Sequence, residues 1–168
     1  MQPISVNLNQ IVADHLQSSP RIIKENVRVE FMSDEGLGNV YADPLHLRKI
    51  LTNLFVNANN SMPDGGELIL LTRNVRRDAS PSSPDSMSES NNYVMLSVTD
   101  TGNGMDDSTI DGIFEPWSAN GEDKKSVAPG LSVIHGIISK YNGGMKVRSK
   151  LGEGTTFQLY FPSGEETA

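Results

Sequence analysis

The clearest structural signal in the sequence is a helix near the middle of the chain. Asp43 can cap this helix, and Pro44 suits its first position, where a proline costs no hydrogen bond. The turn-forming run at 62–66 can end it. Between these limits the apolar residues recur at helical spacing and form one stripe: Leu47, Ile50, Leu51, Leu54, Phe55 and Ala58. Because the stripe needs an apolar surface to cover, the chain must provide a second layer.

The rest of the chain provides that layer as strand-like segments. The pattern predicts strands at 27–33, 67–75, 93–99, 145–149 and 156–161, and a short edge strand at 40–42. Two more main helices are expected at 8–16, capped by Asn7, and at 130–141, with a short helix at 106–114. Three main helices and about five mostly antiparallel strands predict an α+β fold. This is a two-layer sandwich, with one mixed sheet covered on one face by helices.

Two segments look too polar to be part of the core. The run RRDASPSSPDSMSESNN at 76–92 is rich in Ser, Pro and Asp, so we expect an exposed loop that joins the two strands of a hairpin. Residues 115–129 are also polar. With 168 residues, the chain has the length of one domain, 1–168.

The composition excludes several classes of function. A net charge of -7 argues against a nucleic-acid partner, since binding to a duplex needs basic patches that neutralise phosphates. Without cysteines, the chain can form no disulfide and no zinc–cysteine site. We find neither an apolar run long enough to span a bilayer nor a signal peptide. We therefore expect a cytoplasmic chain without direct membrane contact, or a soluble part of a parent anchored in the inner membrane.

Three short segments carry residues suited to binding a nucleotide. Asn53 and Asn57 are four residues apart and so share a helix face, where amide oxygens can bind a hard cation such as Mg²⁺. Asp100 begins a glycine-containing turn and, when ionised, can only accept hydrogen bonds, which suits the adenine amine. The run at 129–132 opens a helix whose free N–H groups can bind an anion, with two lysines just before it. The plain alternatives are a polar helix edge, an ordinary Asp-Gly turn and a simple helix cap. A fourth segment, GEGTTF at 152–157, is a turn that is usually structural.

The order and spacing of these segments resemble a known family. DPLHLRKILTNLFVNANNSMPDGG is similar to the asparagine box of sensor histidine kinases, and VTDTGNGM to their first glycine box. IFEPW resembles the phenylalanine box, and the run from GLSVIHGI to the final strand resembles the second glycine box and the remainder of the family's domain. The chain thus resembles the catalytic ATP-binding domain of these kinases, whose Bergerat fold is shared with gyrase-type topoisomerases, heat-shock chaperones and mismatch-repair ATPases.

On the phosphate side, the resemblance implies a site for ATP and Mg²⁺. Asn57 would coordinate Mg²⁺ on the phosphates, and Asn53 would lie on the same face, near the metal's waters or the phosphates. These two residues are the expected catalytic pair. The helix start, with Gly130, Leu131 and Ser132, would present backbone donors to phosphate.

On the adenine side, the resemblance implies a second set of contacts. Asp100 would accept a hydrogen bond from the adenine amine. Thr155 would support the same side, directly or through water. The turn with Gly102, Gly104 and Met105 would make room for the nucleotide.

The expected ATP lid at 115–129 departs from the family pattern. The family reads roughly F-F-T-T-K and then G-x-G-L-G-L-S, but this chain has WSANG at 117–121 and SVAPGLS at 126–132. One of three expected glycines remains, Gly130, and Gly121 stands where the lid lysine is expected. Pro129 has no N–H to donate and restricts the residue before it. We therefore expect weaker nucleotide binding than in a typical member. Low-micromolar or tighter binding, measured by titration with ATP and Mg²⁺, would contradict this.

The implied reaction is transfer of the γ-phosphoryl of Mg-ATP to a histidine, mainly by positioning and charge neutralisation. In the family that histidine lies on a separate dimerisation domain, which is expected to precede the lead-in segment 1–26, and a response regulator acts downstream. The chain's own His15, His46 and His135 do not lie in a phosphoacceptor context. The chain alone should bind nucleotide without autophosphorylation. Two alternatives are a degenerate, weakly binding regulatory or docking module, and a serine kinase of the anti-sigma type.

Overall fold

A computed structural model describes residues 3–18, 26–76, 92–104 and 131–163 of the chain. The expected short helix at 106–114, most of the loop at 76–92 and the expected lid at 115–129 lie outside these residues.

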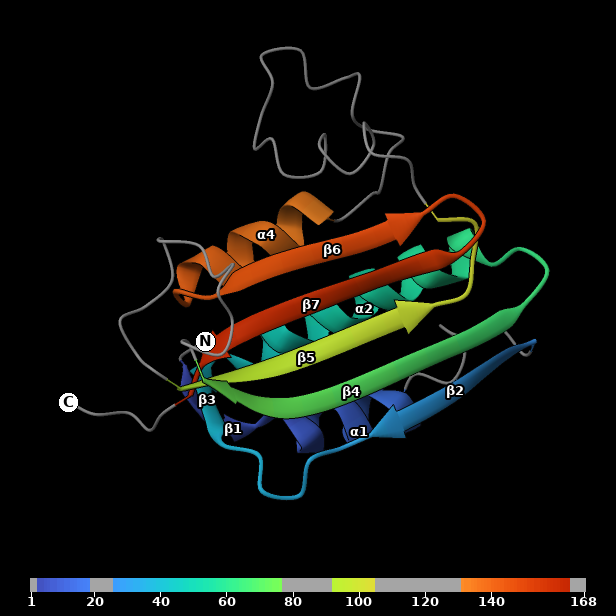
Figure 1. Cartoon of the computed structure of the whole chain (residues 1–168). Helices are drawn as coiled ribbons and strands as arrows, with labels where there is room; N and C mark the ends of the chain where they lie inside the picture. Colours follow the sequence, from blue (N-terminus) through green and yellow to red (C-terminus); the bar gives the residue numbers. More distant parts are fainter. Residues whose placement is uncertain (1–2, 19–25, 77–91, 105–130, 164–168) are drawn as a thin grey trace, which may run out of the picture.

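A five-stranded sheet is the main structural feature of the described residues (Figure 1). Its strand order is β2-β4-β5-β7-β6, where β2 and β4 pair in parallel and the other neighbours pair antiparallel. The strands are β2 (Val27–Met32), β4 (Gly66–Arg76), β5 (Asn92–Asp100), β6 (Gly144–Lys150) and β7 (Gly154–Pro162). Arg76 pairs with Asn92, so the polar segment does connect a hairpin, as the sequence predicted.

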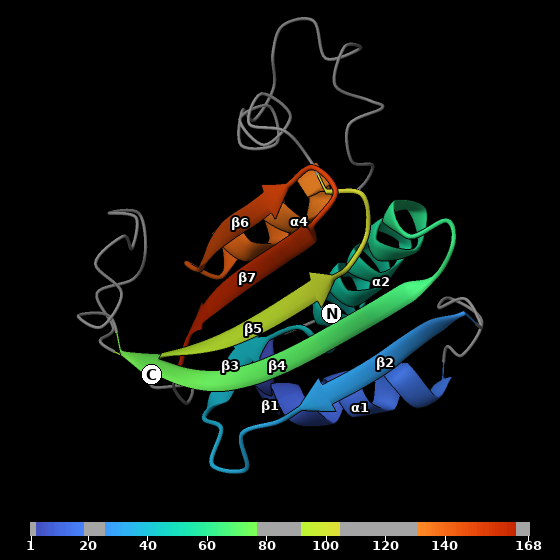
Figure 2. The same cartoon turned by 45° about the vertical axis from the view of Figure 1, so that its right-hand side comes forward.

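Three helices cover one face of this sheet: α1 (Leu8–Ser18), α2 (Pro44–Ser61) and α4 (Leu131–Lys140) (Figures 1 and 2). Alternation along β5 explains the two layers. Val94, Leu96 and Val98 join the large core shared with the helices, while Tyr93 and Met95 belong to a separate apolar cluster. The predicted α+β sandwich, with a mixed and mostly antiparallel sheet, is confirmed.

Helix α2 lies at the centre of this core, as its stripe indicates. Leu47, Ile50, Leu51, Leu54 and Phe55 are each at most 2% exposed. Burying each of these side chains stabilises the fold by roughly 1.5–3 kcal/mol. The Asp43 side chain accepts a hydrogen bond from the backbone N–H of Leu45 at 2.9 Å, and Pro44 is the first helical residue, so both features of the predicted helix start are confirmed.

A second, two-stranded sheet was not expected. The strand β1 (Ile4–Asn7) pairs antiparallel with β3 (Asn39–Ala42). The segment at 40–42 was expected as an edge strand of one single sheet. It lies instead in this separate sheet, and an isolated bridge between Val40 and Ser163 connects it to the residue that follows β7. Four-residue strands carry too short an alternation for the sequence alone to fix their partner.

The contact between α1 and α2 buries a histidine. His15 is 5% exposed, its ring lies 5.5 Å from the Phe55 ring, and its Nε2 lies 3.1 Å from Thr52 Oγ1. His15 is therefore part of the packed contact between the two helices. Burial lowers the pKa of His15 below its usual 6.5, and the positive charge of Arg48 lowers it further.

This buried histidine should make the fold sensitive to acid. Because the folded pKa is lowered, the unfolded chain binds more protons once the pH falls below about 6.5. Stability should be full above that pH and fall below it, by at most about 1.4 kcal/mol per pH unit. Urea unfolding at several pH values measures this slope. A His15→Leu variant, which cannot titrate, should lose that part of the slope, and an unchanged slope would contradict the assignment.

Candidate functional site

Asp100 is the last residue of β5, and it is 5% exposed. In the sheet it pairs with Leu68 of β4 on one side and with Thr155 of β7 on the other. Its Oδ1 accepts a hydrogen bond from the backbone N–H of Gly102 at 2.9 Å and one from the hydroxyl of Ser61 at 3.1 Å. The carboxyl group is thus held in place by two elements, the glycine turn and the end of α2.

The carboxyl group of Asp100 is under opposing influences. Burial raises its pKa above the usual 3.8, and hydrogen bonds from the Gly102 N–H, the Ser61 hydroxyl and the Thr155 N–H lower it. The charged neighbours on the adjoining strands and turns, Glu67, Lys150 and Glu153, are exposed. Within the described part of the chain, the groups that stabilise the ionised form are therefore neutral donors and not a counter-charge.

The turn after Asp100 packs closely against two other segments. The N–H of Asn103 donates to the carbonyl oxygen of Ser61 at 2.9 Å, and its own carbonyl accepts from Gly152 at 2.6 Å. A Cβ on Gly102 would lie 1.9 Å from Ser61 Oγ. A Cβ on Gly104, whose φ is +71°, would lie 1.9 Å from the carbonyl oxygen of Lys150. Both positions require glycine because backbone approaches backbone here.

Helix α2 carries a row of polar side chains at intervals of four residues: Asn53, Asn57 and Ser61. Each step advances about 6 Å along the axis and turns the direction by only about 40°, so the three lie on one side of the helix. Ser61 contacts Asp100, and the two asparagines lie farther toward the start of the helix. Among the described residues, Asn57 Nδ2 is buried and has no hydrogen-bond partner. A buried amide N–H without a partner is costly for a fold, and a bound ligand or water would satisfy it.

Thr155 lies beside Asp100, as the resemblance implies. Thr155 is 5% exposed, and its Oγ1 lies 2.8 Å from Ser149 Oγ. The Ser149 hydroxyl donates a hydrogen bond to the carbonyl oxygen of Gly154 at 2.9 Å. The turn expected to be structural therefore contributes a buried hydroxyl next to the carboxylate.

The structure brings together only some of the predicted residues. Asp100, Gly102, Gly104 and Thr155 cluster at one end of the sheet, and Asn57 lies one helical turn from Ser61 on α2. Leu131 and Ser132 begin α4 as expected, although only their backbone is described. Met105 and Gly130 lie outside the described residues.

Ser61 is a site residue that the sequence did not single out. It continues the four-residue spacing of the two asparagines, and this signal was available. The spacing does not identify Asp100 as the partner of Ser61, because this contact forms only when β5 lies against the end of α2.

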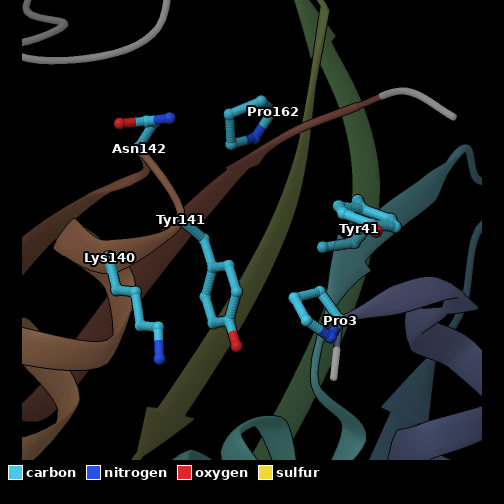
Figure 3. A pocket seen from close by; sticks show the side chains of 7 residues that line it. Pro3, Tyr41, Lys140, Tyr141, Asn142 and Pro162 are labelled. Atoms are coloured by element: carbon cyan, nitrogen blue, oxygen red, sulfur yellow. The ribbon is translucent and has the colours of Figure 1, made fainter. Parts of the chain in front are cut away.

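A pocket of about 370 Å³ lies at the opposite end of the sheet (Figure 3). Pro162 lines the pocket and pairs with Tyr93 near the start of β5. Asp100 lies at the other end of that strand. The lining residues are Pro3, Val40, Tyr41, Lys140, Tyr141, Asn142 and Pro162. None of the predicted nucleotide-binding residues lines this pocket.

Comparison with known proteins gives the class. Residues 42–165 match the family described as histidine kinase-, DNA gyrase B-, and HSP90-like ATPase. The chain belongs to this family of ATPase domains, which confirms the resemblance seen in the sequence. Within the family its relatives are sensor kinases, so the chain is an ATP-binding catalytic domain of the sensor histidine kinase type.

Two of these relatives show how much is shared. The sensor kinase CckA of Brucella abortus is 32% identical over 163 residues, which is 96% of this chain and 17% of the relative. The sensor histidine kinase ZraS of Escherichia coli is 29% identical over 159 residues, 94% of this chain and 30% of the relative. The chain thus spans less than a third of the length of these relatives.

Solved structures support the same fold. The catalytic domain of the histidine kinase ThkA, in a nucleotide-free form, superposes with a TM-score of 0.68 at 20% identity and covers 97% of both chains. The mycobacterial sensor histidine kinase MprB gives 0.67 at 17% identity over 98% of both chains. Among the described residues, no helix is long and apolar enough to cross a membrane.

Proposed function

We propose that this chain binds Mg-ATP at the end of β5 and transfers the γ-phosphoryl group to a histidine on a dimerisation domain outside this sequence. The buried carboxylate of Asp100 carries this proposal. It accepts hydrogen bonds and cannot donate them when ionised, so it selects the amino group of adenine. Thr155 lies beside it and supports the same end of the nucleotide.

The phosphates would extend from Asp100 along α2 toward its first residues. The row of Asn57 and Asn53 runs in that direction at about 6 Å per step. In the described residues, no group of three or more acidic or histidine side chains could hold a metal ion. Mg²⁺ keeps several waters and binds substrate phosphates, so one amide oxygen from Asn57 suits it. When bound, the ion neutralises phosphate charge.

The phosphorylated partner would pass its phosphoryl group to a response regulator, and the chain would work in the cytoplasm. Sensor kinases such as ZraS and CckA carry the same kind of domain, which supports this view. Gly130, Leu131 and Ser132 would supply backbone donors to the phosphates, and Met105 would line the nucleotide.

The direct test is phosphoryl transfer from radiolabelled ATP to a separately supplied dimerisation domain. We expect label on its histidine with the wild-type chain and none on this chain alone. An Asn57→Ala variant should slow transfer by about 10- to 100-fold, the usual cost of losing support for a metal ion. Asn39→Ala, an exposed asparagine on β3, is the matched control and should leave the rate unchanged.

Three results would contradict the proposal. Nucleotide binding without transfer would favour a regulatory or docking module. Label on a serine of the partner would favour a serine kinase of the anti-sigma type. Transfer that survives Asn57→Ala unchanged would exclude the metal-binding role of Asn57.

A further inference from the structure

The hydroxyl of Ser61 and the carboxylate of Asp100 meet across the junction of α2 and β5. Ser61 is the last residue of α2, where a serine hydroxyl commonly bonds to its own helix backbone. Here it donates to Asp100 Oδ1 instead, at 3.1 Å, across 39 residues of sequence. The bond therefore ties the end of the helix to the end of a central strand.

The surrounding backbone fixes Ser61 in that place. Its carbonyl oxygen accepts the N–H of Asn103 at 2.9 Å, so the helix end and the turn after Asp100 are bonded to each other. Gly102 approaches so closely that an added Cβ would lie 1.9 Å from the hydroxyl oxygen and 2.3 Å from the carbonyl oxygen of Ser61. Glycine at position 102 therefore leaves the space in which the Ser61 hydroxyl lies against the carboxylate.

We propose that Ser61 is a positioning residue for nucleotide recognition, holding the Asp100 carboxylate as an ionised acceptor for the adenine amino group. This rests on the proposed function of Asp100. Gly102 and Ser61 donate to the same oxygen, which fixes the plane of the carboxyl group. A hydroxyl that donates to a carboxylate also favours its charged form over the protonated one.

The electrostatics of the site give this hydrogen bond its importance. Burial raises the pKa of Asp100, and the opposing contributions come from the Gly102 N–H, the Ser61 hydroxyl and the Thr155 N–H. Two of these three donors are backbone N–H groups, which a change of side chain to any residue other than proline leaves in place. Ser61 is the one side chain among them, so changing it alters the acidity of Asp100 and leaves the strand pairing in place.

The test is the pH dependence of ATP binding by a Ser61→Ala variant. Binding needs ionised Asp100, so it weakens as the pH falls. Without the hydroxyl this loss should begin at a higher pH. We expect the binding of ATP with Mg²⁺ by the variant to fall below that of wild type by up to about tenfold as the pH is lowered, and to stay within about threefold near pH 8. Ser61→Thr, which keeps the hydroxyl, should restore the wild-type profile.

The outcomes separate this proposal from the one on which it rests. An unchanged pH profile in Ser61→Ala would overturn the role of Ser61 if Asp100→Asn still weakens ATP binding as expected. Undiminished binding by Asp100→Asn would overturn the adenine contact itself. A uniform loss in Ser61→Ala at every pH, not rescued by Ser61→Thr, would show a structural role only and would also overturn the positioning role.

Discussion

Replacing Asp100 with asparagine is expected to weaken ATP binding by about 30- to 100-fold, the effect of losing a buried hydrogen bond between a charged acceptor and its donor. The asparagine keeps the shape of the carboxyl group but loses its charge. Its NH2 group would face either the adenine amine or the donors Gly102 and Ser61, and each arrangement places donor against donor. Isothermal titration with ATP and Mg²⁺ measures the loss.

Asp43→Asn is the matched control for this substitution. Asp43 is also buried, at 3% exposed, but it caps the opposite end of α2, where its backbone N–H donates to the Tyr141 hydroxyl. Asparagine caps helices about as well as aspartate does. The control should therefore remain folded and bind ATP within about twofold of wild type. An equal loss in both variants would mean that Asp100 acts through the fold rather than through the nucleotide.

The parts of the fold that sequence patterns predicted are those with long, regular patterns. The apolar stripe of α2 extends over about three turns, and strand-forming residues fill most of the nine positions of β5. The pairing of β1 with β3 joins residues 4–7 to residues 39–42, and neither segment is long enough to specify its partner. The burial of His15 likewise depends on where α1 meets Phe55 and Thr52, which no local spacing encodes.

In the candidate site, too, some residues can be predicted from a local pattern and others only from their contacts in the fold. Asp100, Gly102 and Gly104 could be named because acceptor and glycine residue types reveal their chemistry locally. Ser61 continues the four-residue spacing of Asn53 and Asn57, but a serine at a helix end has many ordinary roles, and its contact with Asp100 forms only in the folded chain. Residues proposed to touch the nucleotide can be predicted from their type, whereas a residue proposed to act through a neighbour can be recognised only when the sheet places that neighbour beside it.

Alanine substitutions at Gly104 and Gly152 test how much the close backbone packing around Gly104 contributes to stability and to the site. Both have positive φ, +71° and +80°, so an alanine at either costs about 1–2 kcal/mol for a backbone conformation that a Cβ disfavours. At Gly152 an added Cβ meets nothing within 4 Å. At Gly104 it would lie 1.9 Å from the carbonyl oxygen and 2.7 Å from the carbonyl carbon of Lys150, so backbone must move.

We therefore expect Gly152→Ala to lower the melting temperature by about 2–8 °C, the range that strain alone produces in a domain of this size. Gly104→Ala should lose more than about 3 kcal/mol and melt at least about 6 °C below wild type. It should also lose ATP binding below its melting point, since the turn that moves carries the Gly102 N–H bonded to Asp100. Calorimetry and ATP titration on the two variants give the comparison. Equal melting temperatures would show that the approach of Lys150 to this turn is not a constraint on the site.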